Sequence, residues 1–508
     1  MQSQEPANNP PSYDEATKVI LTEVDCPEAL ATSWSNTKKW TVLAVIFIIQ
    51  MSMNLNASLY ASAQRGIMEK FGVGQQAAAT GAAIFLVFYA FGCELWAPWS
   101  EEFGRRIVLQ ASLVLVNVCC VSVGIAEAIG WFPLIIIGRA LGGQFSAGGS
   151  VTLGMVADMF ETNDQEHPLA FIVLSSVGGS IVGPIIGGFI QTNCHWTWAI
   201  WAQVIFGFFA QILHLQLVPE TRASALVAEH ARKLRESGER PNVYGYDEIK
   251  TMKEKLVPSN LFSLWGRPFK MLLTERIVLC LSLLSGFSDA LIFMQIQSFD
   301  RVFKVWNFTE IEVGLAFIPI GIAYMVGYLL YLPVIHRNKA LRRDWPHDDK
   351  AHFESRLWML LWTVPLLPLG MLLFAWTTFP EVPWIVPMIG WLFIGIANYC
   401  IYVTTIDYMV AAYGSYSASA TGSNGFARDL LAGVLTWAAN PYYDAFTMDF
   451  GFQIANTILA GIAFVLVICV YFIYVYGPSM RKKSPFAQSL THSSDRTSST
   501  APSLIVAS

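Results

Sequence analysis

Residues 175–188 read Ser-Ser-Val-Gly-Gly-Ser-Ile-Val-Gly-Pro-Ile-Ile-Gly-Gly and lie inside a longer apolar segment. Counted by fours, they place small residues on two neighbouring lines of a helix: Ser175, Gly179, Gly183 and Gly187 on one, and Ser176, Ser180, Pro184 and Gly188 on the other. In lipid, a helix face without side chains lets another backbone approach closely. A mid-helix proline bends the helix and is tolerated where neighbours satisfy the freed carbonyl. The stretch predicts a smooth, bent membrane helix that neighbours can slide along; the simpler interpretation is an ordinary close-packed helix.

The composition also indicates a membrane setting. Of the 508 residues, 54% are hydrophobic and 14% are charged, whereas soluble domains carry about a quarter charged residues. The net charge of −5 says little, because the charges are segregated along the chain. The polar N-terminal region lacks a basic segment followed by an apolar one, so we expect no cleaved signal peptide. The eight cysteines are scattered, and we expect neither a disulfide framework nor a metal site.

Apolar runs of about 20 residues, the length that crosses a bilayer, fall into two groups of six. The first group covers 41–61, 77–97, 107–127, 132–155, 170–191 and 197–218, and the second covers 277–298, 312–335, 357–378, 384–411, 418–439 and 452–476. We predict an all-α membrane protein with 12 transmembrane helices in two six-helix bundles. The predicted parts are a disordered N-terminus (1–39), a first bundle (40–218), a central loop (219–274), a second bundle (275–476) and a disordered tail (477–508).

The distribution of basic residues predicts the orientation. Most of the 32 Lys and Arg residues lie in the segments on the same side as the N-terminus, which the positive-inside rule assigns to the cytoplasm. Both termini are therefore expected to be cytoplasmic. Asn307-Phe308-Thr309 then falls in an outer loop, where Asn307 could accept a glycan. We expect a multi-pass protein of the plasma membrane, with the vacuolar membrane as the alternative.

The loop after the second span combines acids with two arginines. It reads Ser100-Glu-Glu-Phe-Gly-Arg-Arg106, so a tight glycine turn places Glu101 near Arg105 and Arg106. The simple interpretation is a basic loop that obeys the positive-inside rule. The alternative is a compact ion cluster between two helices, and Glu94, one turn inside, would belong to it.

This loop, together with the six-plus-six pattern, resembles the signature of the major facilitator superfamily, Gly-x-x-x-Asp-x-x-Gly-Arg-(Arg/Lys). Glu101 stands at the Asp position and Ala97 at the first Gly, and this form is similar to that of fungal drug:proton antiporters with 12 spans. Arg139-Ala-Leu-Gly-Gly143 resembles a second family motif, and 179–188 resembles a third, which proton-coupled exporters carry. The resemblance covers about residues 38–480. It implies that Glu101, Arg105, Arg106 and Asp158 form a cytoplasmic latch.

Charges within the predicted spans are costly and therefore mark candidate functional residues. Asp289 lies near the middle of its span with no basic residue close in sequence, so we expect an unpaired carboxylate that carries a proton. Arg139 would assist it. The alternatives are a protonated Asp289 that hydrogen-bonds a neighbouring helix and an Arg139 that only ties spans together. Arg428 and Asp429 diverge by about 100° on a helix, so we expect Arg428 to pair with Asp407 as a gate.

Polar and aromatic residues within spans are candidates for the wall of a substrate cavity: Asn54, Asn56, Gln295, Gln297, Asn398, Tyr399 and Tyr402. No catalytic triad, phosphate-binding loop or nucleotide fingerprint is visible, so we expect neither an enzyme nor a cofactor nor a nucleic-acid partner. We predict that the protein is a monomeric, proton-driven exporter of small organic compounds such as drugs, toxins or secondary metabolites. A polyamine:proton antiporter is the alternative, and a transporter-like sensor is a third.

Overall fold

The computed structural model describes residues 19–161, 164–249, 258–446, 448 and 450–487. Among these residues, ten helices are long and apolar enough to cross a membrane. Two further crossings depart from that simple form. The fourth is broken, and the eleventh is α19 (Ser417–Asp444), which is long but rich in polar residues. All twelve predicted spans therefore have helical counterparts, and the all-α fold with 12 transmembrane helices is confirmed.

The first half of the chain forms six crossings: α1 (Asn36–Phe71), α2 (Gln75–Phe103), α3 (Arg105–Ile129), α4 (Phe132–Ser146) with α5 (Val151–Met159), α6 (Glu166–Asn193) and α7 (Thr197–Leu217). Between α4 and α5 the chain makes a 3₁₀ turn at Ala147–Ser150. The sequence Ser-Ala-Gly-Gly-Ser explains the interruption, because its two adjacent glycines are weak helix formers.

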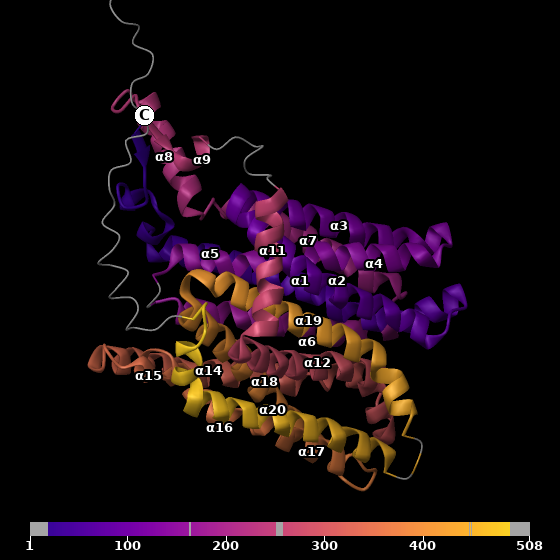
Figure 1. Ribbon diagram of the computed structural model, residues 1–508. Helices are drawn as coiled ribbons and strands as arrows, with labels where there is room; N and C mark the ends of the chain where they lie inside the picture. Colours follow the sequence, from indigo (N-terminus) through magenta and orange to yellow (C-terminus); the bar gives the residue numbers. More distant parts are fainter. Residues whose placement is uncertain (1–18, 162–163, 250–257, 447, 449, 488–508) are drawn as a thin grey trace, which may run out of the picture.

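The second half repeats this arrangement: α12 (Arg276–Phe303), α13 (Glu310–Leu315) with α14 (Ile318–Asp344), α16 (Trp358–Thr363) with α17 (Leu366–Thr377), α18 (Ile385–Tyr413), α19 and α20 (Gly451–Lys482). Smaller elements are β1 (Val19–Leu21), α8 (Ala223–Glu236), β2 (Val243–Gly245), α9 (Tyr246–Ile249), α11 (Pro258–Thr274) and α15 (Asp349–His352). In Figure 1, α11 crosses the long helices at a steep angle, and it contacts α2, α12 and α19.

Each half has its own hydrophobic core, and the halves meet along two seams. One large cluster of buried apolar side chains lies mainly in the second half, and two others lie mainly in the first. The seams are formed by α2 against α19 and by α6 against α13 and α14. Figure 1 shows the two halves side by side, with their long helices running in one general direction.

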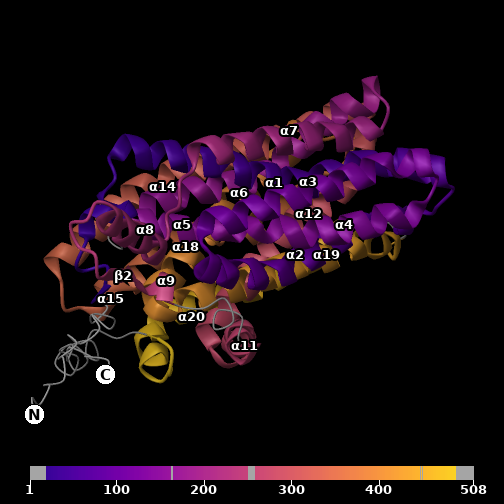
Figure 2. The same cartoon turned by 90° about the horizontal axis from the view of Figure 1, so that it is seen from above.

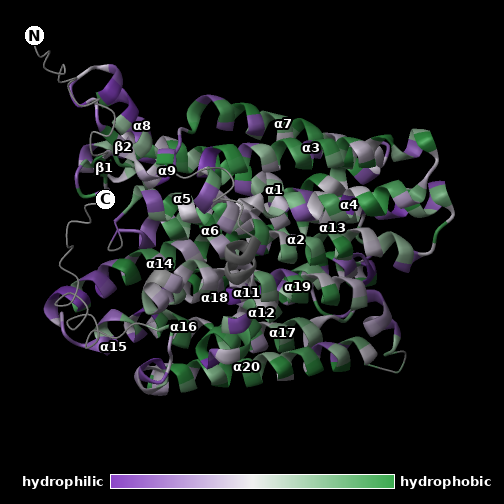
Figure 3. Ribbon diagram, turned by 45° about the horizontal axis from the view of Figure 1, so that its top comes forward, coloured by the Kyte–Doolittle hydropathy of each residue, from purple (hydrophilic) through white to green (hydrophobic). Residues whose placement is uncertain are grey.

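The two ends of the helical bundle differ in polarity. We call the end where α1 begins and α20 finishes the terminal face; it also carries α8, α9 and α15 in both views (Figures 1 and 2). Hydrophilic residues gather around α15 and α8, whereas the long helices are mostly hydrophobic (Figure 3). Large apolar side chains such as Phe464, Val465 and Phe472 of α20 are exposed on the outer surface, as expected for a surface that faces lipid chains.

The glycine-rich stretch packs as its spacing predicts. A Cβ on Gly179 would lie 2.7 Å from the carbonyl oxygen of Met51 in α1, and Gly183 and Gly187 also lie against α1. Ser58 of α1 donates a hydrogen bond of 3.1 Å to the Gly179 carbonyl. Gly188, on the second line, instead faces Glu310 of α13 in the other half. One line of α6 thus joins α6 to its own half, and the other forms part of a seam.

The N-terminal region corrects one prediction. Residues 1–39 are predicted to be disordered, but β1 at Val19–Leu21 pairs in parallel with β2 at Val243–Gly245. Leu21 and Cys26 pack with Val227 and Ala231 of α8 in a small apolar cluster. The physical reason is that Val227, Ala231 and Leu234 form an apolar stripe on α8, which the N-terminal segment covers together with β2.

Candidate functional site

A cavity of about 490 Å³ lies between the two halves. Its wall includes residues of α1, α2, α5 and α6 from the first half and of α18 and α19 from the second. Apolar side chains form much of the surface, among them Leu153, Leu169, Ile172, Val173, Ile406 and Val410. The volume and the predominantly apolar wall suit a small organic molecule.

A buried charge cluster lies at the deep end of this cavity. Arg428 Nε of α19 is 3.7 Å from Asp289 Oδ2 of α12, and its Nη2 is 3.3 Å from Asp429 Oδ2. The guanidinium lies 4.3 Å above the ring of Tyr402. Cys93 of α2 contributes its Sγ, 3.8 Å from Asp429 Oδ2. One arginine between two carboxylates, at the seam between halves, is an arrangement that can change partners when one carboxylate takes up a proton.

Two predicted pairings are wrong. Asp289 is not unpaired, because α12 packs along α19 and brings Arg428 to it. Arg428 does not pair with Asp407; it pairs with its sequence neighbour Asp429. The 100° divergence of adjacent residues limits only their Cα–Cβ directions, and the long arginine side chain curves back to the carboxylate.

Asp407 belongs instead to a network that joins the halves near the terminal face. Arg356 donates to Asp407 Oδ1 and lies 3.1 Å from Glu166 Oε1 of α6. Arg342 of α14 is 2.6 Å from the same glutamate oxygen, and Tyr331 donates to Asp407 at 3.2 Å. The sequence reasoning missed Glu166, Arg342 and Arg356 because charges at span ends look like ordinary interfacial residues. One feature of the sequence could have indicated this network: Glu166 lies at the start of an apolar run.

The residues of the predicted latch lie together. Arg105 Nε is 3.0 Å from Asp158 Oδ2, and its Nη2 is 3.8 Å from Glu101 Oε1. Arg106 departs from the expectation, because its side chain donates to the Leu215 carbonyl rather than to an acid. Glu220 was missed, and it accepts hydrogen bonds from the backbone N–H groups of both arginines at 2.9 and 3.1 Å. All of these residues belong to the first half.

Glu94 is not part of that cluster. It is 6% exposed on α2, and its Oε1 has no hydrogen-bond partner among the described residues. A Cβ on Gly422 of α19 would lie 3.0 Å from its Oε2. The carboxyl group therefore faces the backbone of the other half across the α2–α19 seam.

Arg139 is buried against aromatic rings and backbone carbonyls. It donates to the Asn56 carbonyl and side-chain oxygens at 2.9 and 2.8 Å and to the Gly81 carbonyl at 3.1 Å. Its guanidinium lies over the rings of Tyr60 and Phe85. Within the described part of the chain it has no carboxylate within ion-pair distance, so its contacts tie α4 to α1 and α2.

Of the predicted cavity residues, Tyr402 lies in the cavity wall. The others are engaged elsewhere: Asn54 with Gln50, Asn56 with Arg139, Gln295 with Tyr443 and Asn456, Asn398 with Ser288, and Tyr399 with Ala170. The polar side chains that do line the cavity include Gln50, Ser150, Ser176 and Asn424. Sequence offers no signal for this distinction, because it depends on which way each helix is rotated about its axis.

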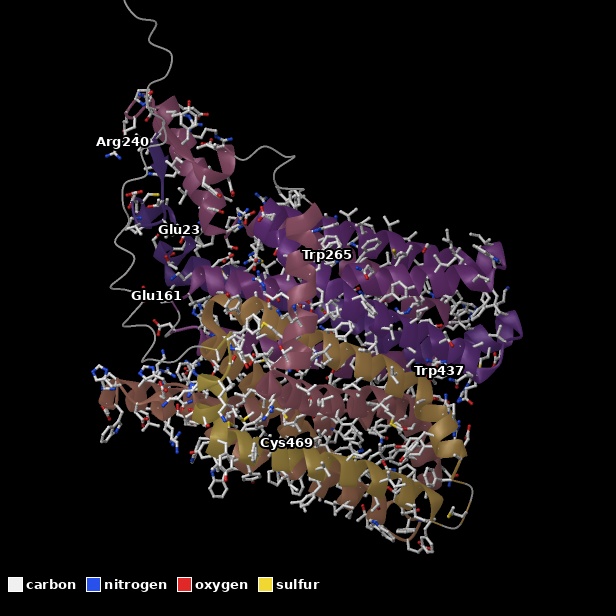
Figure 4. All side chains as sticks on the ribbon, viewed as in Figure 1. Glu23, Glu161, Arg240, Trp265, Trp437 and Cys469 are labelled. Carbon is white, nitrogen blue, oxygen red and sulfur yellow. The ribbon has the colours of Figure 1, made fainter. Side chains whose placement is uncertain are left out.

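The opposite face of the bundle is closed by contacts between the halves. Arg65 of α1 is 2.6 Å from Glu310 and 3.6 Å from Asp300 of the second half. Trp437 of α19, labelled at that end in Figure 4, donates to Thr80 of α2 at 3.3 Å. Gln297 lines a smaller hollow of about 170 Å³ there. Asn307 is exposed at the same end, with φ at 55°.

Among the described residues, no group of three or more His, Cys, Asp or Glu side chains is placed to hold a metal ion. Twelve crossings, two joined halves and a charge cluster beside a central cavity define a multi-span membrane transporter. A family model described as Major Facilitator Superfamily matches residues 43–436. The chain belongs to this superfamily.

Curated relatives are fungal transporters. The chain is 29% identical to the transporter paaT of Penicillium rubens over 476 residues, covering 92% of this chain and 84% of the relative. It is 27% identical over 475 residues to the probable drug/proton antiporter YHK8 of Saccharomyces cerevisiae, covering 91% and 88%. The superfamily and these relatives are transporters, so the chain is a transporter rather than an enzyme.

Solved structures share the fold at low sequence identity. The proton:xylose symporter XylE of E. coli aligns with a TM-score of 0.63 at 14% identity, over 87% of this chain and 97% of that one. The human organic anion transporter MFSD10 aligns with a TM-score of 0.54 at 18% identity, over 86% and 99%.

Proposed function

We propose that the protein is a proton-coupled exporter of small organic compounds such as drugs, toxins or secondary metabolites, working by alternating access. The observation that carries the proposal is the Asp289–Arg428–Asp429 cluster at the seam between the halves, beside the cavity. Protonation of Asp289 would remove one of the two negative partners of Arg428. The guanidinium would then shift toward Asp429, which couples proton uptake to a change at the seam.

Direction and orientation belong to the same proposal. The terminal face is cytoplasmic, because most of the basic residues lie on that side. The cavity walls reach Glu101 and Arg105 at that end, so substrate enters from the cytoplasm, and the pairs of Arg65 close the outer end. The similarity to a probable drug/proton antiporter supports export. We place the protein in the plasma membrane as a monomer, with Asn307 glycosylated.

The test is transport in proteoliposomes with an imposed pH gradient. Fluconazole, an uncharged azole, is the first substrate probe, and spermidine tests the polyamine alternative. Asp289→Asn is expected to abolish gradient-driven accumulation of the probe while leaving exchange without a gradient. Asp344→Asn is the matched control, because Asp344 is exposed and pairs with its neighbour Arg343 at the end of α14, outside the cavity wall. Unchanged gradient-driven transport in Asp289→Asn would remove the cluster from the mechanism.

A further inference from the structure

The polar groups of the cavity divide into two sets. The charged side chains that line the cavity are already paired: Glu101 with Arg105, Arg105 with Asp158, Arg356 with Asp407 and Glu166, and Arg428 with Asp289 and Asp429. A ligand that carried a net charge would need one of these pairs to open. Breaking a buried pair leaves an uncompensated charge, which is strongly unfavourable.

The uncharged set is incompletely satisfied. Gln50 of α1 is 5% exposed, and its Oε1 has no hydrogen-bond partner within the described part of the chain. Asn424 of α19 is fully buried, and neither its oxygen nor its nitrogen has a partner there. Both residues line the cavity. Buried amides without partners are rare and costly, so each needs an explanation.

These two amides belong to a set that spans the cavity from one half to the other. Gln50 Nε2 donates to Ser176 Oγ at 3.4 Å, and Ser176 Oγ lies 3.4 Å from Tyr402 Oη of the second half. Both contacts are long for hydrogen bonds, so a ligand oxygen can replace them at small cost. Asn424 lies one helical turn from Arg428 on the same face of α19, and the guanidinium of Arg428 lies over the Tyr402 ring.

From these contacts we propose that the cavity binds uncharged, oxygen-bearing organic molecules, with Gln50 and Asn424 as the specificity-determining residues. The ligand's carbonyl and hydroxyl groups bond Gln50 and Ser176 on one side and Asn424 and Tyr402 on the other. The apolar residues of α5, α6 and α18 cover its hydrocarbon part. Because it contacts both halves, the ligand also links binding to their relative position. This assignment rests on the proposed transport function and excludes polyamines as preferred substrates.

The test measures direct binding to the purified full chain in nanodiscs without a proton gradient. Cycloheximide and fluconazole are the uncharged probes, and spermidine, tetraphenylphosphonium and benzoate are the charged ones. At least one uncharged probe is expected to bind more tightly than every charged one. Gln50→Met and Asn424→Leu are each expected to weaken its affinity about tenfold, the usual effect of losing a buried hydrogen bond. Asn117→Leu is the matched control: Asn117 is a buried amide bonded to Gln211, away from the cavity.

A third variant keeps the assignment testable if Gln50→Met and Asn424→Leu fold poorly. Gln50→Glu adds a carboxylate without changing the side-chain length, and it is expected to raise the affinity for tetraphenylphosphonium at least tenfold. Tighter binding of a charged probe by the wild type, or no binding of either uncharged probe, would overturn the assignment. Binding is measured without a gradient, so selective binding with no proton-driven transport would refute the proposed function and leave this inference standing.

Discussion

The ion-pair partners of single buried residues could not be predicted from the sequence. Arg481 reads as one of several basic residues after the last span, yet it is 2% exposed and its Nη2 lies 3.0 Å from Glu354 Oε2. Its guanidinium also lies over the ring of Phe353. Glu354, Arg356 and Asp407 likewise pair with partners that are distant in sequence. Composition predicted which residues are costly to bury, but the partners depend on which helices pack together.

The Arg481–Glu354 pair gives a stability prediction. Arg481→Met leaves a buried carboxylate without its cation, and the free energy of unfolding is expected to fall by about 3 kcal/mol. Adding Glu354→Leu should recover most of the loss, because no unpaired charge then remains. The measurement is the denaturation midpoint in detergent for both single variants and the double variant. Arg343→Met serves as the control, since Arg343 is 81% exposed; an equal loss in that variant would contradict the argument.

Glu94 gives a prediction at the α2–α19 seam. Gly422→Ala would place a methyl group 3.0 Å from the Glu94 carboxyl group, so we expect slower transport because the seam no longer closes tightly. Glu94→Ala in the same chain removes the obstructing group and should restore the rate. Gly461→Ala is the control, because Gly461 lies on α20 away from the cavity and a Cβ there meets no neighbouring element within 4 Å. Two independent, additive effects in the double variant would show that the residues do not touch in the working protein.

At the scale of elements, the sequence predicted most of what the structure contains. Each apolar run became either one helix or two consecutive helices of a single crossing. The pairing of β1 with β2 was not predicted, because three-residue strands carry no readable pattern and their partners lie far apart in the chain. The break between α4 and α5 was missed for a related reason: Gly148 and Gly149 also fit a packed helix. The periodicity of apolar residues predicts whether a segment is a helix or a strand, but it does not predict which other elements that segment contacts.

The two lines of small residues on α6 give a prediction about conformation. Gly188→Ala would bring a methyl group to 2.6 Å from the Glu310 carbonyl in the other half, whereas Gly179→Ala would meet the Met51 carbonyl within the same half at 2.7 Å. We expect Gly188→Ala to open the face opposite the terminal face, and Gly179→Ala to lower stability without changing access. Labelling of a cysteine placed at Gln297 measures that access. Equal labelling in the two variants would refute the assignment of the line of small residues that contains Gly188 to the seam between the halves.

The small unit of α8, α9 and β2 gives a pH prediction. Arg235 donates to both Glu248 oxygens at 2.9 and 2.8 Å, and this pairing, with the Gly245 N–H, lowers the pKa of Glu248 below its ordinary 4.5. A lowered folded-state pKa means that the contribution to stability is present above about pH 4.5 and disappears as the pH falls through the lower value. The hydrogen-exchange protection factors of the β2 amides, which correct for the intrinsic pH dependence of exchange, should therefore fall only under acid conditions. Glu248→Gln is expected to remove this dependence; a persistent acid transition would assign it to another group.

At the scale of the whole molecule, the ion pairs between the halves lie at both ends of the cavity. Near the terminal face Asp164 is 2.6 Å from Lys339, beside the Glu166 network, and at the opposite face Arg65 is 2.6 Å from Glu310. If the halves rock against each other, one set must open while the other stays closed. Exposed pairs of this kind contribute about 1 kcal/mol or less, so they can break within a transport cycle without halting it.

Cross-linking tests this requirement directly. Asp164→Cys with Lys339→Cys, and separately Arg65→Cys with Glu310→Cys, place one thiol on each half, in a background without the eight native cysteines because Cys194 is exposed. Lysine and arginine side chains reach further than cysteine, so each pair of thiols is bridged through disulfides to a short bis-methanethiosulfonate reagent. Each cross-link is expected to stop transport, and reduction should restore it. The terminal-face cross-link should leave the opposite face accessible to a membrane-impermeant thiol reagent at Gln297→Cys, whereas the other should protect it. Continued transport with either cross-link closed would mean that the halves move as one body and that the substrate crosses by another route.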